Sequence, residues 1–202
     1  MEASARQVRD GTKDRLIAAA AESLRTGGYA GTSARSIARI GDLNQALVFY
    51  HFGSVDRLLL AALEDSSRAR MERYITETER VSTLQELVDV ARRLYDEDLA
   101  AGHITILAEM IGASLARAEL RDEVMALMDP WVSFAEQLVA RFLDPIGITS
   151  MIPAQQIAIA VLGFYLGFNT LSYLGADDAR ADDLFASATS LTKLFAPMGE
   201  QG

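Results

Sequence analysis

The sequence predicts an all-α protein of about nine helices, and three observations support that fold class. Apolar residues recur every three or four positions along nearly the whole chain, as in Leu16, Ala20 and Leu24. No segment of useful length alternates apolar and polar residues as a half-buried strand does. Residues that begin or end helices punctuate the pattern, including a Thr-x-x-Glu capping box that starts at Thr83.

Most predicted helices have a start or stop signal of their own. Thr12 is the expected N-cap of the first helix, and the Gly27-Gly28 pair ends it. Asn44 and Ser54 each carry a side-chain oxygen that caps the following helix. Pro130 is expected to kink or interrupt a long helix. The predicted helices cover residues 12–27, 33–40, 44–50, 54–80, 84–102, 104–115, 118–143, 153–175 and 180–195.

The composition excludes several classes of chemistry. The chain has 202 residues, half of them hydrophobic, and no cysteine, which excludes disulfides, thiol catalysis and cysteine-based zinc sites. The N-terminal residues lack the apolar core of a signal peptide. The most apolar stretch, residues 157–168, is shorter than the roughly 18 residues that span a membrane. We therefore expect a cytoplasmic protein with no membrane segment, no metal and no cofactor.

Charge is distributed unevenly along the chain. The net charge is −9, yet residues 1–58 hold 8 Arg or Lys against 6 Asp or Glu, while residues 59–202 hold 11 against 22. A mildly basic head on an acidic body is compatible with DNA binding by the head alone, because the attraction to phosphate is electrostatic. The charge of the head is equally compatible with an ordinary solvated surface.

Residues 33–52 have the pattern of a helix-turn-helix. Two short helices flank a tight turn at Gly41-Asp42, and Ile37 and Val48 are spaced to pack the two helices together. The second helix is then free to enter a major groove with its N-terminal residues nearest the bases. In that position Gln45 has the geometry to pair with adenine, and a nearby arginine, Arg35, with guanine.

Other polar and apolar groups around the motif are suited to contact the DNA backbone and the thymine methyl group. Ala46 or Leu47 can contact a thymine methyl, and hydroxyl or imidazole groups can hold phosphates. Structural alternatives exist for several of them, because Arg35 can be a solvated helix residue and His51 can be hydrogen-bonded inside the fold. Three aromatic residues of the motif are expected to lie partly in the core, namely Phe49, Tyr50 and Phe52.

Three motifs stand at set spacings between residues 12 and 63: the turn GGYAGTS, the pair Ile37-Ala38, and the block VFYHFGSVDRLL. With these motifs the segment resembles the TetR family of repressors, whose aromatic–x–His–Phe signature precedes the fourth helix. Beyond residue 63 the similarity is one of pattern and length only. The resemblance implies an N-terminal DNA-binding domain over residues 1–53 and a C-terminal helical ligand-binding and dimerisation domain over residues 54–202.

Carried over by position, the resemblance adds Asn44 and Phe49 to the contact residues. Three positions depart from the family pattern: Phe49 stands where tyrosine is usual, Asp42 where glycine is usual, and Val55 where lysine is usual. Aspartate tolerates the left-handed turn conformation, but two usual contacts with DNA are missing. We therefore expect each DNA-binding domain to bind DNA more weakly than is usual in the family, so that tight binding depends more on dimerisation. The predicted DNA-contacting residues are Thr32, Ser33, Arg35, Asn44, Gln45, Ala46, Leu47, Phe49, Tyr50 and His51.

The C-terminal helices hold aromatic residues and a few polar groups of the kind that line apolar ligand cavities. His103 and Asn169 are polar side chains within apolar segments, where each needs a partner. Core packing at helical spacing explains the aromatic residues as well as a ligand does. The predicted ligand-binding residues are His103, Leu107, Met110, Trp131, Phe134, Phe164, Phe168 and Asn169.

The last two predicted helices are apolar on more than one face. Val161 and Phe164 belong to one stripe of the first of them, and Leu162 and Tyr165 to another. A helix with two apolar faces fits a core face plus a partner face. The family resemblance implies a two-fold dimer through these helices, whose symmetry matches a palindromic operator. The predicted dimer residues are Leu162, Tyr165, Leu166, Leu184, Leu191 and Leu194.

These features together predict a ligand-responsive transcription regulator, a repressor that binds double-stranded DNA as a homodimer and is released by a small, largely apolar effector. The helix that begins at Ser54 links the two predicted domains and is the expected lever. Catalysis is disfavoured, because the two histidines lie far apart in the chain and the GxSxG, HExxH and phosphate-loop motifs are absent. A helical small-molecule-binding or interaction protein without DNA binding is the alternative.

Overall fold

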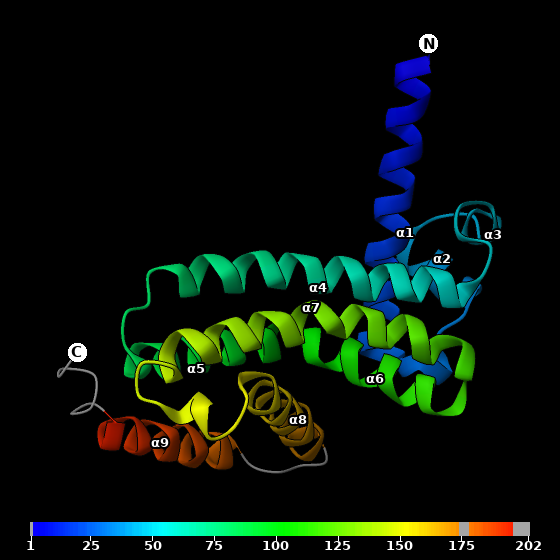
Figure 1. Cartoon of the computed structure of the whole chain (residues 1–202). Helices are drawn as coiled ribbons and strands as arrows, with labels where there is room; N and C mark the ends of the chain where they lie inside the picture. The colour runs from blue at the N-terminus through cyan, green and yellow to red at the C-terminus, as the bar shows by residue number, and fades with distance from the viewer. Residues whose placement is uncertain (1, 174–177, 196–202) are drawn as a thin grey trace. The chain divides into compact units, whose positions relative to one another are not determined.

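A computed structural model describes the backbone of residues 2–173 and 178–195 and the side chains of residues 11–168 and 182–193. Over these residues the chain forms nine α-helices and one 3-10 helix without any strand, which confirms the predicted all-α fold (Figure 1). The elements in chain order are α1 (Glu2–Gly31), α2 (Ala34–Gly41), α3 (Ala46–Phe52), α4 (Val55–Glu79), α5 (Leu84–Ala101), α6 (His103–Ala116), α7 (Ala118–Leu143), η1 (Ile148–Ser150), α8 (Ala154–Tyr173) and α9 (Asp178–Phe195).

The described chain divides into two compact units. The first comprises the residues up to Arg70 together with Ala101–Leu127, and the second comprises Met71–Ala100 together with the residues from Met128 onward. Each unit has its own buried core. The first core includes Leu16, Leu24, Ile37, Val48, Leu58 and Met110, and the second includes Leu94, Tyr95, Trp131 and Ala158. The domain boundary predicted between residues 53 and 54 stays a prediction.

Local capping signals act where the sequence predicts them. Asn44, Ser54 and Thr83 each accept a hydrogen bond from a main-chain amide two or three residues later, at 2.9, 3.2 and 3.1 Å. Each bond satisfies an amide at a helix start that has no partner within the helix. The boundaries of α3, α4 and α5 therefore follow from short-range side-chain chemistry.

One helix starts earlier than predicted, and another continues through a proline. α1 begins at Glu2 rather than near Thr12, because the residues before Thr12 include the good helix formers Ala, Arg and Gln. Its regular geometry is broken at Gly28, where φ is 65° and ψ is 179°, close to the predicted stop. α7 has the predicted bounds and continues through Pro130, so the helix is not interrupted there. A kink at Pro130 stays a prediction.

Among the described helices, none on its own is both long and apolar enough to cross a membrane, although two sharply bent helix pairs reach the required length and composition together.

Candidate functional site

Helices α2 and α3 form the predicted helix-turn-helix within the first unit. Ile37 and Val48 are fully buried, one on each helix, as the sequence predicts. The turn between the helices contains Asp42 in the left-handed conformation, with φ 48° and ψ 55°. Arg15 of α1 donates to the carbonyl oxygen of Gly41 at 2.8 Å and to that of Asp42 at 3.3 Å. The turn is therefore held from a third helix, by a residue that the sequence did not single out.

The residues predicted to contact bases surround the start of α3. The side chains of Asn44, Gln45 and Ala46 are exposed, whereas Leu47 is half-buried. On α2, Arg35 is also exposed in the first turn. Asn44 Oδ1 accepts the hydrogen bond from Ala46 N–H, and the amide NH₂ of this exposed side chain can act as a donor. The first turn of α3 thus presents polar side chains together with one small apolar one.

The aromatic segment that ends α3 is more exposed than expected. The sequence suggested that Phe49 and Tyr50 lie partly in the core. Their side chains are instead 54% and 68% exposed, so neither belongs to the core. His51 and Phe52 are half-buried, and the Tyr50 and His51 rings meet edge to face with centroids 4.9 Å apart. Large apolar groups in water carry a hydration cost, so their exposure points to a surface that binds a partner.

The hydroxyl groups before α2 are engaged within the protein. Ser36 N–H donates to Ser33 Oγ at 3.1 Å, and Ser33 N–H donates to Ser36 Oγ at 2.8 Å, which forms a capping box. Thr32 Oγ1 donates to the carbonyl oxygen of Gly28 at 2.7 Å and lies 3.0 Å from Ser23 Oγ. These two predicted phosphate contacts, Thr32 and Ser33, therefore also shape the turn that presents α2.

A polar cluster attaches the α1–α2 turn to α4 and α6, all within the first unit. Tyr29 N–H donates to Glu109 Oε2 at 2.7 Å, and the Tyr29 hydroxyl donates to Asp56 Oδ1 at 2.7 Å. Arg117, directly after α6, donates to Asp56 Oδ2 at 2.7 Å and lies over the Tyr29 ring at 5.5 Å. We call Tyr29, Asp56, Glu109 and Arg117 the α6 clasp. Its members lie far apart in sequence, and no local motif could have revealed it.

Two observations show how closely the clasp is fitted. Partial burial, followed by the hydrogen bond to Asp56, raises the pKa of the Tyr29 phenol to about 12. A Cβ atom at Gly28 would lie 2.9 Å from Glu109 Oε2, and the positive φ there also favours glycine. The helix-turn-helix is therefore docked on α6 through Tyr29 as well as through the packing of α1 against α6.

The predicted ligand residues of the first unit already have protein partners. His103 Nδ1 lies 2.8 Å from Ser66 Oγ of α4, which satisfies the polar ring that the sequence singled out. Met110 is fully buried and Leu107 is 8% exposed, so both belong to the core of the unit.

The predicted ligand residues of the second unit fall into two groups. Trp131 and Phe134 pack edge to face against Tyr74, with centroid distances of 5.2 and 6.3 Å. Phe164 and Phe168 stack on each other at 6.1 Å, and Phe164 is 51% exposed. The side chain of Asn169 lies outside the described residues.

The predicted dimer residues are mostly half-buried in the single chain. Leu162, Tyr165, Leu166 and Leu184 are half-buried, Leu191 is 56% exposed, and the side chain of Leu194 lies outside the described residues. Tyr165 packs against Tyr95 of α5 at 6.1 Å. Among the described side chains of α8, the most exposed large apolar residues are Ile159, Val161 and Phe164. Val161 and Phe164 belong to the stripe that does not contain the predicted dimer residues.

Within the part of the chain that the structure describes, no group of three or more His, Cys, Asp or Glu side chains is arranged to hold a metal ion.

Comparisons with known proteins match both the N-terminal segment and the fold. The model of the bacterial regulatory proteins of the tetR family matches residues 16–62. No curated protein matches the chain. A solved structure from Rhodococcus assigned to the TetR-family transcriptional regulators superposes with a TM-score of 0.74 at 18% identity, over 89% of this chain and 97% of that one.

Two further solved structures have the same fold. A TetR-family member from Streptomyces coelicolor is 25% identical, with a TM-score of 0.61 over 87% of this chain and 96% of that one. The transcriptional regulator FadR from Bacillus subtilis, solved with stearoyl-CoA, is 17% identical, with a TM-score of 0.69 over 89% and 95%. The chain therefore carries a segment, residues 16–62, that is similar to the tetR family of bacterial regulatory proteins, and it shares its fold with solved TetR-family regulators.

Proposed function

We infer that the chain is a transcriptional repressor that binds a palindromic operator as a homodimer in the cytoplasm and is released by a small, largely apolar effector. The observation that carries the inference is the start of α3, where Asn44, Gln45 and Ala46 are exposed. Val48 of the same helix is buried and packs it against the rest of the first unit. Such a helix fits a major groove with its first residues at the base edges. Arg35, at the start of α2, is the proposed second base contact.

Backbone contacts complete the proposed DNA surface. Tyr50 and His51 follow the base-contacting residues on α3, and the exposed Tyr50 hydroxyl is a suitable donor to phosphate. Phe49 is exposed without a polar group, so its proposed role is apolar contact with the sugar backbone. Thr32 and Ser33 position the start of α2 through the bonds described above, and in this proposal they support phosphate contacts by its main-chain amides.

The proposed dimer forms through α8 and α9. Exposed apolar side chains on both helices favour burial against a second copy, because single solvated helices seldom carry so many. We extend the proposed interface from the leucines and Tyr165 to Ile159, Val161 and Phe164, since these α8 residues are the more exposed ones. A two-fold axis through such an interface presents two α3 helices to two half-sites.

The proposed effector acts by population shift. A ligand that binds better to a conformation with the wrong separation of the two α3 helices lowers the affinity for the operator. α4 starts directly after the helix-turn-helix and is one proposed route for that change. The Bacillus subtilis FadR complex with stearoyl-CoA supports the idea that this fold accommodates a ligand with a long hydrocarbon chain.

Selection of genomic DNA fragments by the purified chain tests the proposal. A recovered palindrome that is released steeply with rising salt is the expected result, because phosphate contacts release counterions. A helical binding module without DNA affinity, the alternative function, would enrich no sequence and show no salt slope. Sedimentation velocity tests the homodimer separately, and Phe164→Asp is expected to shift the chain toward the monomer.

A further inference from the structure

One face of α1 contacts α2 at both of its ends. Arg15, Ala19 and Ser23 follow one another at four-residue intervals, so they lie on the same face of the helix. Ser23 Oγ lies at hydrogen-bonding distance from two hydroxyl groups around the start of α2, 3.0 Å from Thr32 Oγ1 and 3.2 Å from Ser36 Oγ. These contacts fix the first turn of α2 on α1, within the first unit.

The other end of α2 meets the same face at the turn into α3. A Cβ atom added at Gly41 would lie 3.1 Å from Ala19 Cβ, tighter than ordinary van der Waals contact, so the turn lies directly against α1. Arg15 Nη2 carries two hydrogens and donates to the carbonyl oxygens of Gly41 and Asp42, at 2.8 and 3.3 Å. Because Arg15 is itself exposed, it contributes hydrogen bonds to the turn rather than buried apolar surface.

The two carbonyl groups that Arg15 holds belong to the peptide groups on either side of the Asp42 Cα atom. Each peptide group is planar, so their relative orientation depends on the φ and ψ angles of Asp42. These angles are 48° and 55°, in the left-handed region that is unfavourable for residues with a side chain. Two hydrogen bonds from one guanidinium nitrogen therefore restrain both angles of the residue that bends the chain after α2.

The direction of α3 depends on that bend. The helix has seven residues, and Val48 is its buried residue. A short helix anchored at one buried side chain can pivot about it unless one end of the helix is also held. Residues 42–45 join α2 to α3, so the restrained turn at Asp42 holds the first end of α3. Asn44 and Gln45, which are proposed to contact bases, lie in this same connection.

We propose that Arg15 is a positioning residue for DNA recognition, which holds the α2–α3 turn and thereby sets the direction in which α3 presents Asn44 and Gln45 to the bases. The inference rests on the proposed DNA-binding function. Hydrogen bonds to base edges need distances of about 2.7–3.2 Å and good alignment, whereas attraction to phosphates acts over a Debye length of about 8 to 10 Å. A pivot of α3 therefore weakens binding to the operator more than binding to other DNA.

Fluorescence anisotropy with two labelled duplexes, the selected operator and a scrambled sequence of the same length, tests the role in recognition on the full chain. Arg15→Ala should weaken operator binding by about tenfold, as the loss of one good base contact does, and change binding to the scrambled duplex by less than about threefold. The slope of log affinity against log salt should change by less than about 0.5, because no phosphate contact is lost. Arg15→Lys should recover at least about half of the lost operator affinity on a logarithmic scale, because one ammonium nitrogen can supply both donors.

Hydrogen exchange measured by NMR tests the turn itself without DNA. The amide of Leu43 donates across the turn at 2.9 Å, and that of Val48 donates within the first turn of α3 at 3.2 Å. Loss of the two Arg15 hydrogen bonds should speed exchange at both amides by about tenfold or more. The amide of Ile37 donates to Ser33 near the other end of α2, and its exchange should change by less than about threefold.

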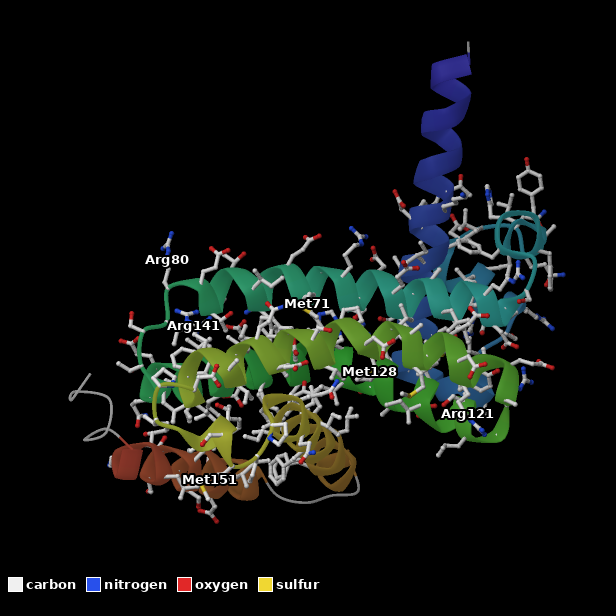
Figure 2. The ribbon with its side chains drawn as sticks, in the orientation of Figure 1. Met71, Arg80, Arg121, Met128, Arg141 and Met151 are labelled. Carbon is white, nitrogen blue, oxygen red and sulfur yellow. The ribbon has the colours of Figure 1, made fainter. Side chains whose placement is uncertain are left out.

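Arg121→Ala is the matched control, because Arg121 is an exposed arginine of the first unit that lies on α7, as Figure 2 labels it, and belongs to neither α1 nor the turn. It should leave both duplex affinities and the exchange rates within about twofold of those of the unchanged chain. Equal losses for the two duplexes in Arg15→Ala, with a salt slope smaller by about 1, would make Arg15 a phosphate contact and overturn the positioning role. A lysine variant as weak as the alanine variant would overturn the role of the hydrogen bonds.

The two measurements separate this proposal from the function on which it rests. A chain that selects no DNA sequence would refute the proposed regulator, while the exchange rates still decide whether Arg15 holds the turn. Unchanged exchange at Leu43 and Val48, or equal acceleration at Ile37, would refute a specific restraint on the turn. Faster exchange at Leu43 and Val48 with undiminished discrimination between the two duplexes would overturn the role of Arg15 in recognition.

Discussion

Replacing Asp56 by alanine removes the centre of the α6 clasp, and the structure sets the size of the effect. The Tyr29 hydroxyl loses a charged acceptor at 2.7 Å, and such bonds contribute about 1.5–3 kcal/mol, the lower figure applying to a partly solvated pair. The ion pair with Arg117 adds about 0.5 kcal/mol, because the two side chains are 32% and 50% exposed. Asp56 also lies in the first turn of α4, where a carboxylate adds about 0.5 kcal/mol. We expect a loss of about 2.5 kcal/mol in the free energy of unfolding.

Urea unfolding measured by far-ultraviolet circular dichroism checks this value, while fluorescence of the single tryptophan, Trp131, reports on the second unit. Asp65→Ala is the control, because Asp65 lies on the same helix and pairs with the exposed Arg68, so its loss should be below about 0.5 kcal/mol. A double-mutant cycle of Asp56→Ala with Tyr29→Phe should give a coupling of about 1 kcal/mol. Coupling near zero, or equal losses at Asp56 and Asp65, would refute the reasoning.

Three other predictions concern the first unit. Arg35→Ala and Gln45→Ala should each weaken operator binding by about tenfold without a change in helix content, while the exposed Arg121→Ala should leave it unchanged; unchanged binding in both test variants would contradict the base contacts. The pKa of Tyr29 is about 12 in the folded chain and about 10 in the unfolded chain. The contribution of Tyr29 to the free energy of unfolding should therefore be fully present below pH 10 and be lost as the pH rises to 12. The expected loss is about 1 kcal/mol after allowance for the exposure of the side chain. Tyr29→Phe should lack this loss of stability between pH 10 and 12. If the variant and the unchanged chain lose the same stability in that range, the phenol is not hydrogen-bonded as described. Ser33→Ala should cost about 1 kcal/mol by loss of the α2 cap, measured by thermal unfolding, and no shift would contradict the capping role.

Short-range interactions account for what could be predicted before the structure. The caps at Asn44, Ser54 and Thr83 involve residues two or three positions apart, so a residue type at a given spacing is enough to reveal them. The same holds for the turn at Asp42, where a residue that tolerates positive φ follows a glycine. The burial of Ile37 and Val48 follows from periodicity, because the two helices are too short to pack in another way.

Long-range contacts account for the departures. Phe49 and Tyr50 were expected partly in the core, but their exposure depends on which face of α3 packs against the rest of the first unit. On α8, two apolar stripes were visible in the sequence, and only the packing of Tyr165 on Tyr95 decides which stripe turns inward. Hydrophobicity alone does not distinguish a core face from a partner face, since both are apolar.

The sequence by itself therefore determined the all-α fold, the helix boundaries near caps and glycines, and the helix-turn-helix with its resemblance to the TetR family, because each depends on residues close together in the chain. Only the tertiary structure decided that Tyr29, Asp56, Glu109 and Arg117 meet, since the hydrogen bonds join residues 27 to 80 positions apart.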